Sequence, residues 1–179
     1  MEITWLGNAA FRIRAKEGVV LTDPAPKTTG YNMSRPTADI VTISCDDPRH
    51  NAIEAVAGEP RRFDAPGEYE VSGVLLTGVR TTRTDGVHNT VFVIEMEEVR
   101  VCHLGRLDRM PTAAEIEAMN EPDILLVPAG GGGALDGKQA SEVATLLNAR
   151  IVIPMAYKTE AATGDLEPLE GFLKATGQA

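Results

Sequence analysis

The sequence contains little cysteine and no long apolar run. Only Cys45 and Cys102 occur among its 179 residues, and two cysteines cannot form the disulfide framework of a small secreted domain. No segment approaches the roughly 18 apolar residues of a transmembrane helix, and the opening MEITWLGN lacks the basic and apolar regions of a signal peptide. We therefore expect a cytoplasmic protein that does not bind a membrane.

Positive charge is also scarce. The chain has 17 Lys and Arg residues against 26 Asp and Glu residues, which gives a formal net charge of −9 at pH 7. Nucleic-acid binding requires an excess of positive charge on one face, because the protein must neutralise phosphates. Nucleic acid is therefore not an expected partner. The composition leaves the oligomeric state unknown.

Length and composition predict one folded domain. A chain of 179 residues with 43% hydrophobic residues can build one well-formed core and is short for two. No linker rich in proline, glycine or serine divides the sequence, and it contains no internal repeat. We expect a single domain over residues 1–179, in which 160–179 form a C-terminal helix and tail.

The first half of the chain is a series of short apolar or alternating segments, which predicts strands. A short helix is expected over residues 50–57, where Gly58 and Pro60 would end it. The predicted strands cover residues 2–6, 10–15, 18–24, 39–44, 69–79, 90–97 and 99–105.

The second half alternates helices and strands. Strands are expected at 123–129 and 150–155, because both segments are apolar after a charged first residue. Thr112 and Glu115 have the spacing of a capping box at a helix start, and Asp136 is a suitable N-cap for the next helix. Antiparallel strands followed by this alternation predict a layered α/β protein with its strands sandwiched between helices.

Polar residues follow four of the predicted strands, at 45–50, 80–86, 103–108 and 154–159. Ligand sites in open α/β sheets lie at strand ends, so these segments define a candidate site. The candidate site residues in them include Cys45, Asp46, Asp47, Arg49, His50, Arg83 and Arg106. Cysteine, histidine and aspartate can bind a metal ion, whereas arginine has no lone pair to donate.

Several segments resemble the metallo-β-lactamase fold hydrolases, in particular the short branch that is similar to L-ascorbate-6-phosphate lactonase. The resemblance covers about residues 1–159 and implies an αββα sandwich with metal ions held at the strand ends. It rests on ITWLGNAAF (3–11), VLTDP (20–24), ADIVTISCDDPRHN (38–51), FDAPGEYEVSGV (63–74), NTVFVIE (89–95), VCHLGRL (101–107), DILLVPAGGG (123–132) and RIVIPMAYKT (150–159).

The metal-ligand pattern that this resemblance implies is degraded here. The signature loop of the family reads His-x-His-x-Asp-His, and its positions hold Cys45, Asp47, Arg49 and His50. The other ligand positions of the family correspond to Asn8, Arg83, Arg106 and Ala156. Only His50 keeps the residue of the family.

The number of remaining ligands argues against a metal ion. A hydrolytic zinc site needs three protein ligands, which Cys45, Asp47 and His50 could in principle supply. The arginines, however, would place positive charge where the family binds two dications. Two unit charges about 4 Å apart repel by roughly 4 kcal/mol at an effective dielectric of 20, and a dication doubles this repulsion. We therefore predict a metal site that has been lost.

Other interpretations of single residues are structural. Cys45 is also expected as a small buried apolar residue, because cysteine often packs in this way. Asp23 is expected to fix a turn. The glycines in AGGGGALDGK are expected to permit a tight loop near the site, because the segment lacks the Gly-Lys-Ser/Thr of a phosphate-binding loop.

The leading interpretation is a non-catalytic, metal-free pseudoenzyme without a cofactor, in which arginines replace the metal ions. It predicts that Arg106 and at least one of Arg49 and Arg83 bind Asp46 or Asp47, and that the site also takes a small anionic ligand such as a phosphorylated sugar.

Two alternatives remain open. One is an active hydrolase with a single zinc ion at Cys45, Asp47 and His50. The other is a scaffold or regulatory protein without a small ligand, which a broad apolar surface patch would favour.

Overall fold

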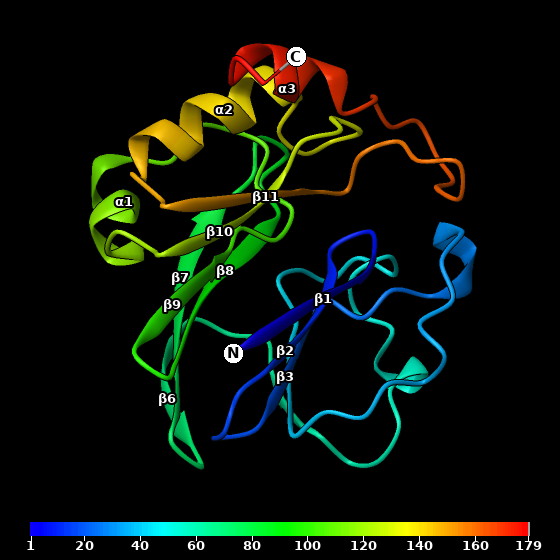
Figure 1. Ribbon diagram of the computed structural model, residues 1–179, viewed down its shortest axis with the longest axis vertical. Coiled ribbons are helices and arrows are strands. Elements are labelled where there is room, and N and C mark those ends of the chain that lie inside the picture. The colour runs from blue at the N-terminus through cyan, green and yellow to red at the C-terminus, as the bar shows by residue number, and fades with distance from the viewer. Residues whose placement is uncertain (179) are drawn as a thin grey trace.

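Two β-sheets face each other in the computed structural model, which describes residues 1–178 (Figure 1). The first sheet has the strand order β1-β2-β3-β4-β5, and the second has the order β11-β10-β9-β8-β7-β6. The first sheet consists of β1 (Glu2–Gly7), β2 (Ala10–Arg14), β3 (Val19–Thr22), β4 (Ile40–Thr42) and β5 (Arg61–Phe63). The second consists of β6 (Gly67–Val71), β7 (Val74–Thr82), β8 (His88–Met96), β9 (Val99–His103), β10 (Ile124–Pro128) and β11 (Ile151–Met155).

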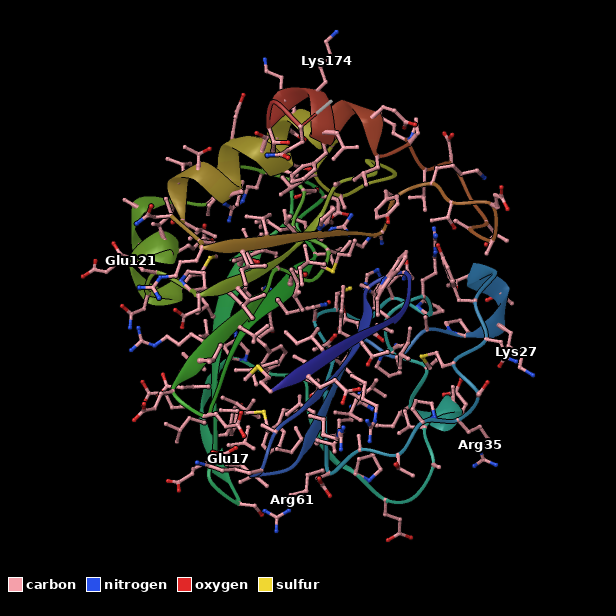
Figure 2. The ribbon with its side chains drawn as sticks, in the orientation of Figure 1. Glu17, Lys27, Arg35, Arg61, Glu121 and Lys174 are labelled. Atoms are coloured by element: carbon pink, nitrogen blue, oxygen red, sulfur yellow. The ribbon has the colours of Figure 1, made fainter. Side chains whose placement is uncertain are left out.

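The main apolar core lies between the two sheets. Phe11 and Ile13 alternate with arginines along β2, so both point inward, where they meet Phe92 and Ile94 of β8. Burial of each such side chain contributes about 1.5–3 kcal/mol. Charged side chains such as Lys27 and Glu121 project outward from the surface (Figure 2). The patterning of the strands thus determines which faces of the sheets meet.

Three α-helices cover the outer face of the second sheet (Figure 1). They are α1 (Ala113–Met119), α2 (Gly137–Leu146) and α3 (Glu170–Ala175). The predicted capping box of α1 is confirmed, because the Thr112 side chain accepts from the Glu115 N–H and the Glu115 carboxylate accepts from the Thr112 N–H. Asp136 is likewise the N-cap of α2. Such caps stabilise a helix by about 1 kcal/mol each.

The outer face of the first sheet is covered differently. Within residues 1–178 this side has only the 3₁₀ turns η1 (Lys27–Thr29) and η2 (Ile53–Ala55) and irregular chain. The helix predicted over 50–57 is therefore wrong, because the Ala52 N–H donates to the Pro24 carbonyl instead of to its own segment. The predicted α/β fold with two stacked sheets is confirmed, with its α-helices on one side of the sandwich.

One strand prediction needs correction, and one strand was missed. The segment 69–79 is not one strand, because a turn at Ser72 and Gly73, with φ of 53° and 85°, divides it into β6 and β7. Positive φ at both central residues is typical of the tight turns that join hairpin strands. The short strand β5 was not predicted. This segment is a strand because it pairs in parallel with β4, which is a tertiary contact.

The site edge of the sandwich results from parallel pairing. β3, β4 and β5 are parallel to one another, as are β9, β10 and β11. The chain segments that follow these strands therefore leave each sheet at one edge, and the bond from the Thr90 N–H to the Ser44 carbonyl joins the two sheets there. In the described chain, no helix combines the length and apolarity needed to cross a membrane.

Candidate functional site

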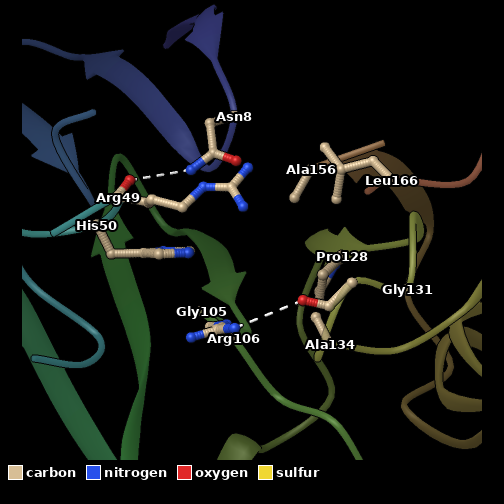
Figure 3. A pocket seen from close by; sticks show the side chains of 11 residues that line it. Asn8, Arg49, His50, Gly105, Arg106, Pro128, Gly131, Ala134, Ala156 and Leu166 are labelled. Atoms are coloured by element: carbon tan, nitrogen blue, oxygen red, sulfur yellow. Dashed lines mark hydrogen bonds between the residues drawn. The ribbon is translucent and has the colours of Figure 1, made fainter. Parts of the chain in front are cut away.

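A small cavity lies at this edge of the sandwich (Figure 3). Its volume of about 20 Å³ gives room for about one water molecule. Three of the four predicted strand-end segments reach it, and the glycine-rich segment after β10 completes its wall. The lining residues are Asn8, Arg49, His50, Gly105, Arg106, Pro128, Gly131, Gly132, Ala134, Ala156 and Leu166.

His50 is held in the cavity wall by the buried carboxylate of Asp23. The His50 Nδ1–H donates to Asp23 Oδ2 at 2.8 Å, and the Ser44 N–H and hydroxyl donate to the same carboxylate at 2.7 and 2.5 Å. The ring of His50 points into the cavity between Arg49 and Arg106 (Figure 3). The carboxylate thus sets the tautomer of His50 and leaves Nε2 on the cavity side.

Asp23 stays ionised although it is fully buried. Burial raises the pKa of a carboxyl group, but the imidazoles of His103 and His50 and the hydrogen bonds from His50 and Ser44 outweigh it, so the pKa of Asp23 lies below its usual value. The sequence predicted only that Asp23 fixes a turn, and its bond to His50 was missed. The available signal was a carboxylate directly after an apolar strand, where a charge needs partners.

Arg106 forms an ion pair with Asp47. Its Nη1 contacts Asp47 Oδ2, and its Nη2 donates to the Gly132 carbonyl at 3.5 Å (Figure 3). The backbone N–H of Arg106 donates to Asn89 Oδ1 at 2.8 Å, so this residue is also anchored independently of its guanidinium. The predicted charge-assisted contact between Arg106 and Asp47 is therefore present.

The other predicted arginine contacts are wrong. The Arg83 guanidinium binds Asp85 at 2.8 Å and lies 4.0 Å from Asp108, because Asp85 belongs to the same tight turn and needs little ordering of the chain. The Arg49 guanidinium donates to the Thr163 carbonyl at 3.3 Å.

The Asp46 carboxylate is bound to Asn51 and not to a guanidinium group. It is exposed and accepts from Asn51 Nδ2 at 2.9 Å. Asp47 does contact Arg49, but through the backbone N–H of Arg49, which donates to Asp47 Oδ1 at 2.8 Å. The loop thus presents one of its two carboxylates to the arginines.

Cys45 does not line the cavity that contains His50. It lines a separate cavity of about 420 Å³ with Ser44, Asp46 and His88 among its walls. Burial, together with the charge of Asp23, raises the pKa of Cys45 to about 12, so the thiol is protonated at neutral pH. These properties agree with a small buried residue.

The donor set does not fit the zinc ion that the resemblance implies. Nowhere in residues 1–178 do three His, Cys, Asp or Glu side chains gather so that they could hold a metal ion. Of the residues 1–178 that line the cavity, His50 is the single imidazole, none is a carboxylate, and two are arginines. Asn8 uses its side-chain N–H to bind the Arg49 carbonyl at 3.0 Å, and Ala156 offers a methyl group.

Two glycines allow the close approach of the segments around the cavity. At Gly105, which has a φ of 60°, a Cβ atom would lie 2.3 Å from the Cβ of Ser44, so only glycine lets the end of β9 reach the end of β4. At Gly133 a Cβ atom would lie 2.9 Å from Arg106 Nη2 and 3.7 Å from Arg83 Nη2. The two guanidinium groups therefore approach the same glycine, and the fourth predicted strand end borders the site through Arg83.

Comparisons with known sequences agree with this architecture. Residues 2–156 match the family model described as a beta-lactamase superfamily domain. A UPF0173 metal-dependent hydrolase of Methanoculleus marisnigri is 27% identical and covers 98% of this chain and 90% of its own.

Two solved structures have similar folds. A Thermotoga maritima protein, proposed to be a Zn-dependent hydrolase of the metallo-β-lactamase superfamily, is 44% identical, with a TM-score of 0.83 over 96% of this chain and 84% of its own. Igni18, a metallo hydrolase of Ignicoccus hospitalis, has a TM-score of 0.69 at 19% identity over 98% of this chain and 90% of its own, which is a likeness of fold alone.

Proposed function

Because the chain belongs to the metallo-β-lactamase superfamily, we propose that it is a metal-free, non-catalytic member that binds a small anion at the edge where this fold holds metal ions. The observation that supports this proposal is the composition of the cavity wall. Two guanidinium groups, from Arg49 and Arg106, flank the imidazole of His50, and Arg83 approaches from the side.

Ligand number and charge both act against a zinc ion. A catalytic zinc ion needs three protein ligands, and the metal-dependent hydrolysis assigned to the relatives needs such a site. Here Asp47 is already bound to Arg106, and the Cys45 thiol faces another cavity. A dication within about 4 Å of the Arg49 guanidinium, whose partner is the neutral Thr163 carbonyl, would meet repulsion of several kcal/mol.

The same groups favour an oxyanion. A guanidinium group binds carboxylate or phosphate through a planar pair of N–H donors. The chain as a whole carries −9, and Arg83 and Arg106 are already paired with Asp85 and Asp47. The positive charge that would attract an anion here comes from the Arg49 guanidinium, which donates to the neutral Thr163 carbonyl. With about 20 Å³ available, the cavity can admit little more than one oxygen of a ligand such as a phosphorylated sugar, whose remainder would lie outside.

The proposed location is the cytoplasm. Cys45 and Cys102 are both buried and free in the structure. Unpaired thiols are typical of a reducing compartment, where disulfides rarely persist.

Metal analysis tests the metal-free state directly. The chain is expressed with added zinc, purified without chelators, and its zinc content is measured by atomic emission. We expect far less than one zinc ion per chain. Stoichiometric zinc that is lost in C45A and H50A would instead establish the single-metal alternative.

Anion binding is tested by calorimetry with inorganic phosphate. Native protein should bind phosphate, and Arg106→Gln should weaken binding by about tenfold or more, since a charge-assisted contact contributes about 1.5–3 kcal/mol. Arg35→Gln is a matched control, because Arg35 is an exposed arginine remote from the cavity lining. Equal phosphate affinity in R106Q and R35Q would contradict the proposed site.

A further inference from the structure

The guanidinium of Arg106 already holds an anion, which belongs to the chain itself. Asp47 Oδ2 contacts Nη1, while Nη2 makes only the long 3.5 Å contact with the Gly132 carbonyl. Half of the planar donor pair is therefore occupied by a carboxylate and half is weakly used. The side chains of Arg106 and Asp47 are 25% and 19% exposed, so solvent reaches both.

We propose that Asp47 is an internal competitor that occupies Arg106 in the absence of ligand and yields this position to the oxyanion of the ligand. This inference rests on the anion-binding function proposed above and deepens it. It assigns the ligand to compact oxyanions, either a carboxylate or a phosphate group, because the position already accepts a carboxylate.

Asp47 can leave Arg106 without unfolding its loop. Its second oxygen, Oδ1, accepts from the Arg49 N–H at 2.8 Å, and the Asp47 carbonyl accepts from the His50 N–H at 2.8 Å. These two bonds hold the turn and do not involve Arg106. A partly exposed ion pair contributes less to stability than a fully buried one, so its exchange for an external anion is energetically accessible.

Arg106 can likewise change partner without moving its backbone. The Arg106 N–H is bound to Asn89, which is buried and also donates to Thr81 Oγ1 and to the Leu104 carbonyl at 3.0 and 3.1 Å. Arg83 differs from Arg106 in this respect, because its guanidinium is almost fully buried between Asp85 and Asp108. Arg106 is therefore the exchangeable arginine, whereas Arg83 is held by its own carboxylates.

The space beside Arg106 suits an incoming oxyanion. Arg83 Nη2 and Arg106 Nη2 both approach Gly133, whose missing side chain leaves space beside Arg106 Nη2. An oxyanion at this position would take the underused Nη2 of Arg106 first and then displace the Asp47 carboxylate from Nη1. Each step exchanges one charge-assisted contact for another, without formation or cleavage of a covalent bond.

The test compares Asp47→Asn with native protein and with Asp46→Asn by calorimetric titration with inorganic phosphate and, separately, with acetate. Asn at position 47 keeps an oxygen for the Arg49 N–H but removes the competing charge. If Asp47 occupies Arg106 about nine-tenths of the time, its removal raises the apparent affinity about tenfold. D46N removes the same charge from the neighbouring residue, which binds Asn51 and not Arg106, and should change affinity by less than about twofold.

Each outcome distinguishes the competitor from the binding site itself. A gain in D47N alone supports the exchange. Equal gains in anion affinity in D47N and D46N would show a general charge effect, and an unchanged affinity in D47N would show that Asp47 does not compete. Either result overturns the inference. The proposed function still stands in both cases if native protein binds the anion. Absence of binding in every variant, native included, would overturn the proposed function. Binding of only phosphate or only acetate narrows the ligand to that class.

Native protein provides a second readout if D47N fails to fold. Saturation with phosphate should shift the carboxyl ¹³C resonance of Asp47, because this carboxylate loses its guanidinium partner, and leave that of Asp46 in place. Movement of neither resonance at saturating phosphate would overturn the exchange. Thermal melting of each variant shows whether the fold is intact.

Discussion

Asp23, Ser44 and His50 form a buried network that reaches the cavity through His50, and both carboxylate oxygens of Asp23 are bound in it. In contrast, Arg49 and Arg106 in the same cavity wall bind partners that solvent can reach. The inner network has the arrangement that would orient a metal-binding imidazole. The outer layer, Asn8, Arg49, Arg106 and Ala156, lacks the donors that would complete a metal site.

The difference between the two layers has a physical cause. Removal of one member of a buried network leaves a charge or a polar group uncompensated, which is strongly destabilising. Residues at the cavity wall can exchange with solvent or with each other at little cost in stability. A chain can therefore keep the framework of a metal site while the residues that face the metal become unsuitable for it.

The largest effect is expected for Asp23→Ala. This change leaves His50 Nδ1 and the Ser44 N–H and hydroxyl without their acceptor, so the free energy of unfolding should fall by about 3–5 kcal/mol. Urea unfolding followed by circular dichroism measures it. As a control, Asp64→Ala removes a carboxylate that pairs with Arg62 at the surface and should cost less than about 1 kcal/mol.

Acid should reveal the same network in the unmodified chain. The pKa of folded Asp23 lies below its unfolded value of about 3.9, so its contribution to stability is fully present above that value. The contribution is lost as the pH falls through the folded pKa. Asp23→Asn should therefore show a shallower loss of unfolding free energy below about pH 4 than native protein. Parallel pH curves would mean that Asp23 is not ionised in the fold.

An intermediate effect is expected for Arg106→Ala. The ion pair with Asp47 is only partly exposed, so the loss should lie near 1–2 kcal/mol, about midway between surface and fully buried pairs. A double-mutant cycle with Asp47→Asn isolates the pairwise term. A coupling energy close to zero would show that Arg106 behaves as an ordinary surface arginine.

The smallest effect is expected for Ala156→His. Ala156 has a φ of 50°, a conformation in which histidine is tolerated better than most residues, so the variant should fold. It adds one imidazole near His50 but leaves Arg49 and Arg106 in place, so zinc content should remain far below one ion per chain by atomic emission.

A double variant sharpens this result. A156H combined with Arg106→Asp supplies a third donor and removes a cation, so bound zinc should increase relative to either single change. Stoichiometric zinc in A156H alone would contradict the view that the arginines exclude the metal.

The sequence by itself determined the layers and the edge at which the site lies. The alternation along β2 directs Phe11 inward, and Thr112 and Asp136 begin helices through contacts within three residues. These features depend on local geometry and on the burial of apolar surface, which a linear pattern records. The collection of polar residues after several strands likewise indicated the site edge before any contact was known.

Only the tertiary structure decided which charges meet. Arg83 binds Asp85 of its own turn, Arg106 reaches Asp47 from another sheet, and Asp23 turns out to hold His50. The reach of a long side chain and the competition between near and distant partners depend on distances and burial that sequence spacing does not contain. The strength of an ion pair depends on those same quantities, because the effective dielectric changes with burial.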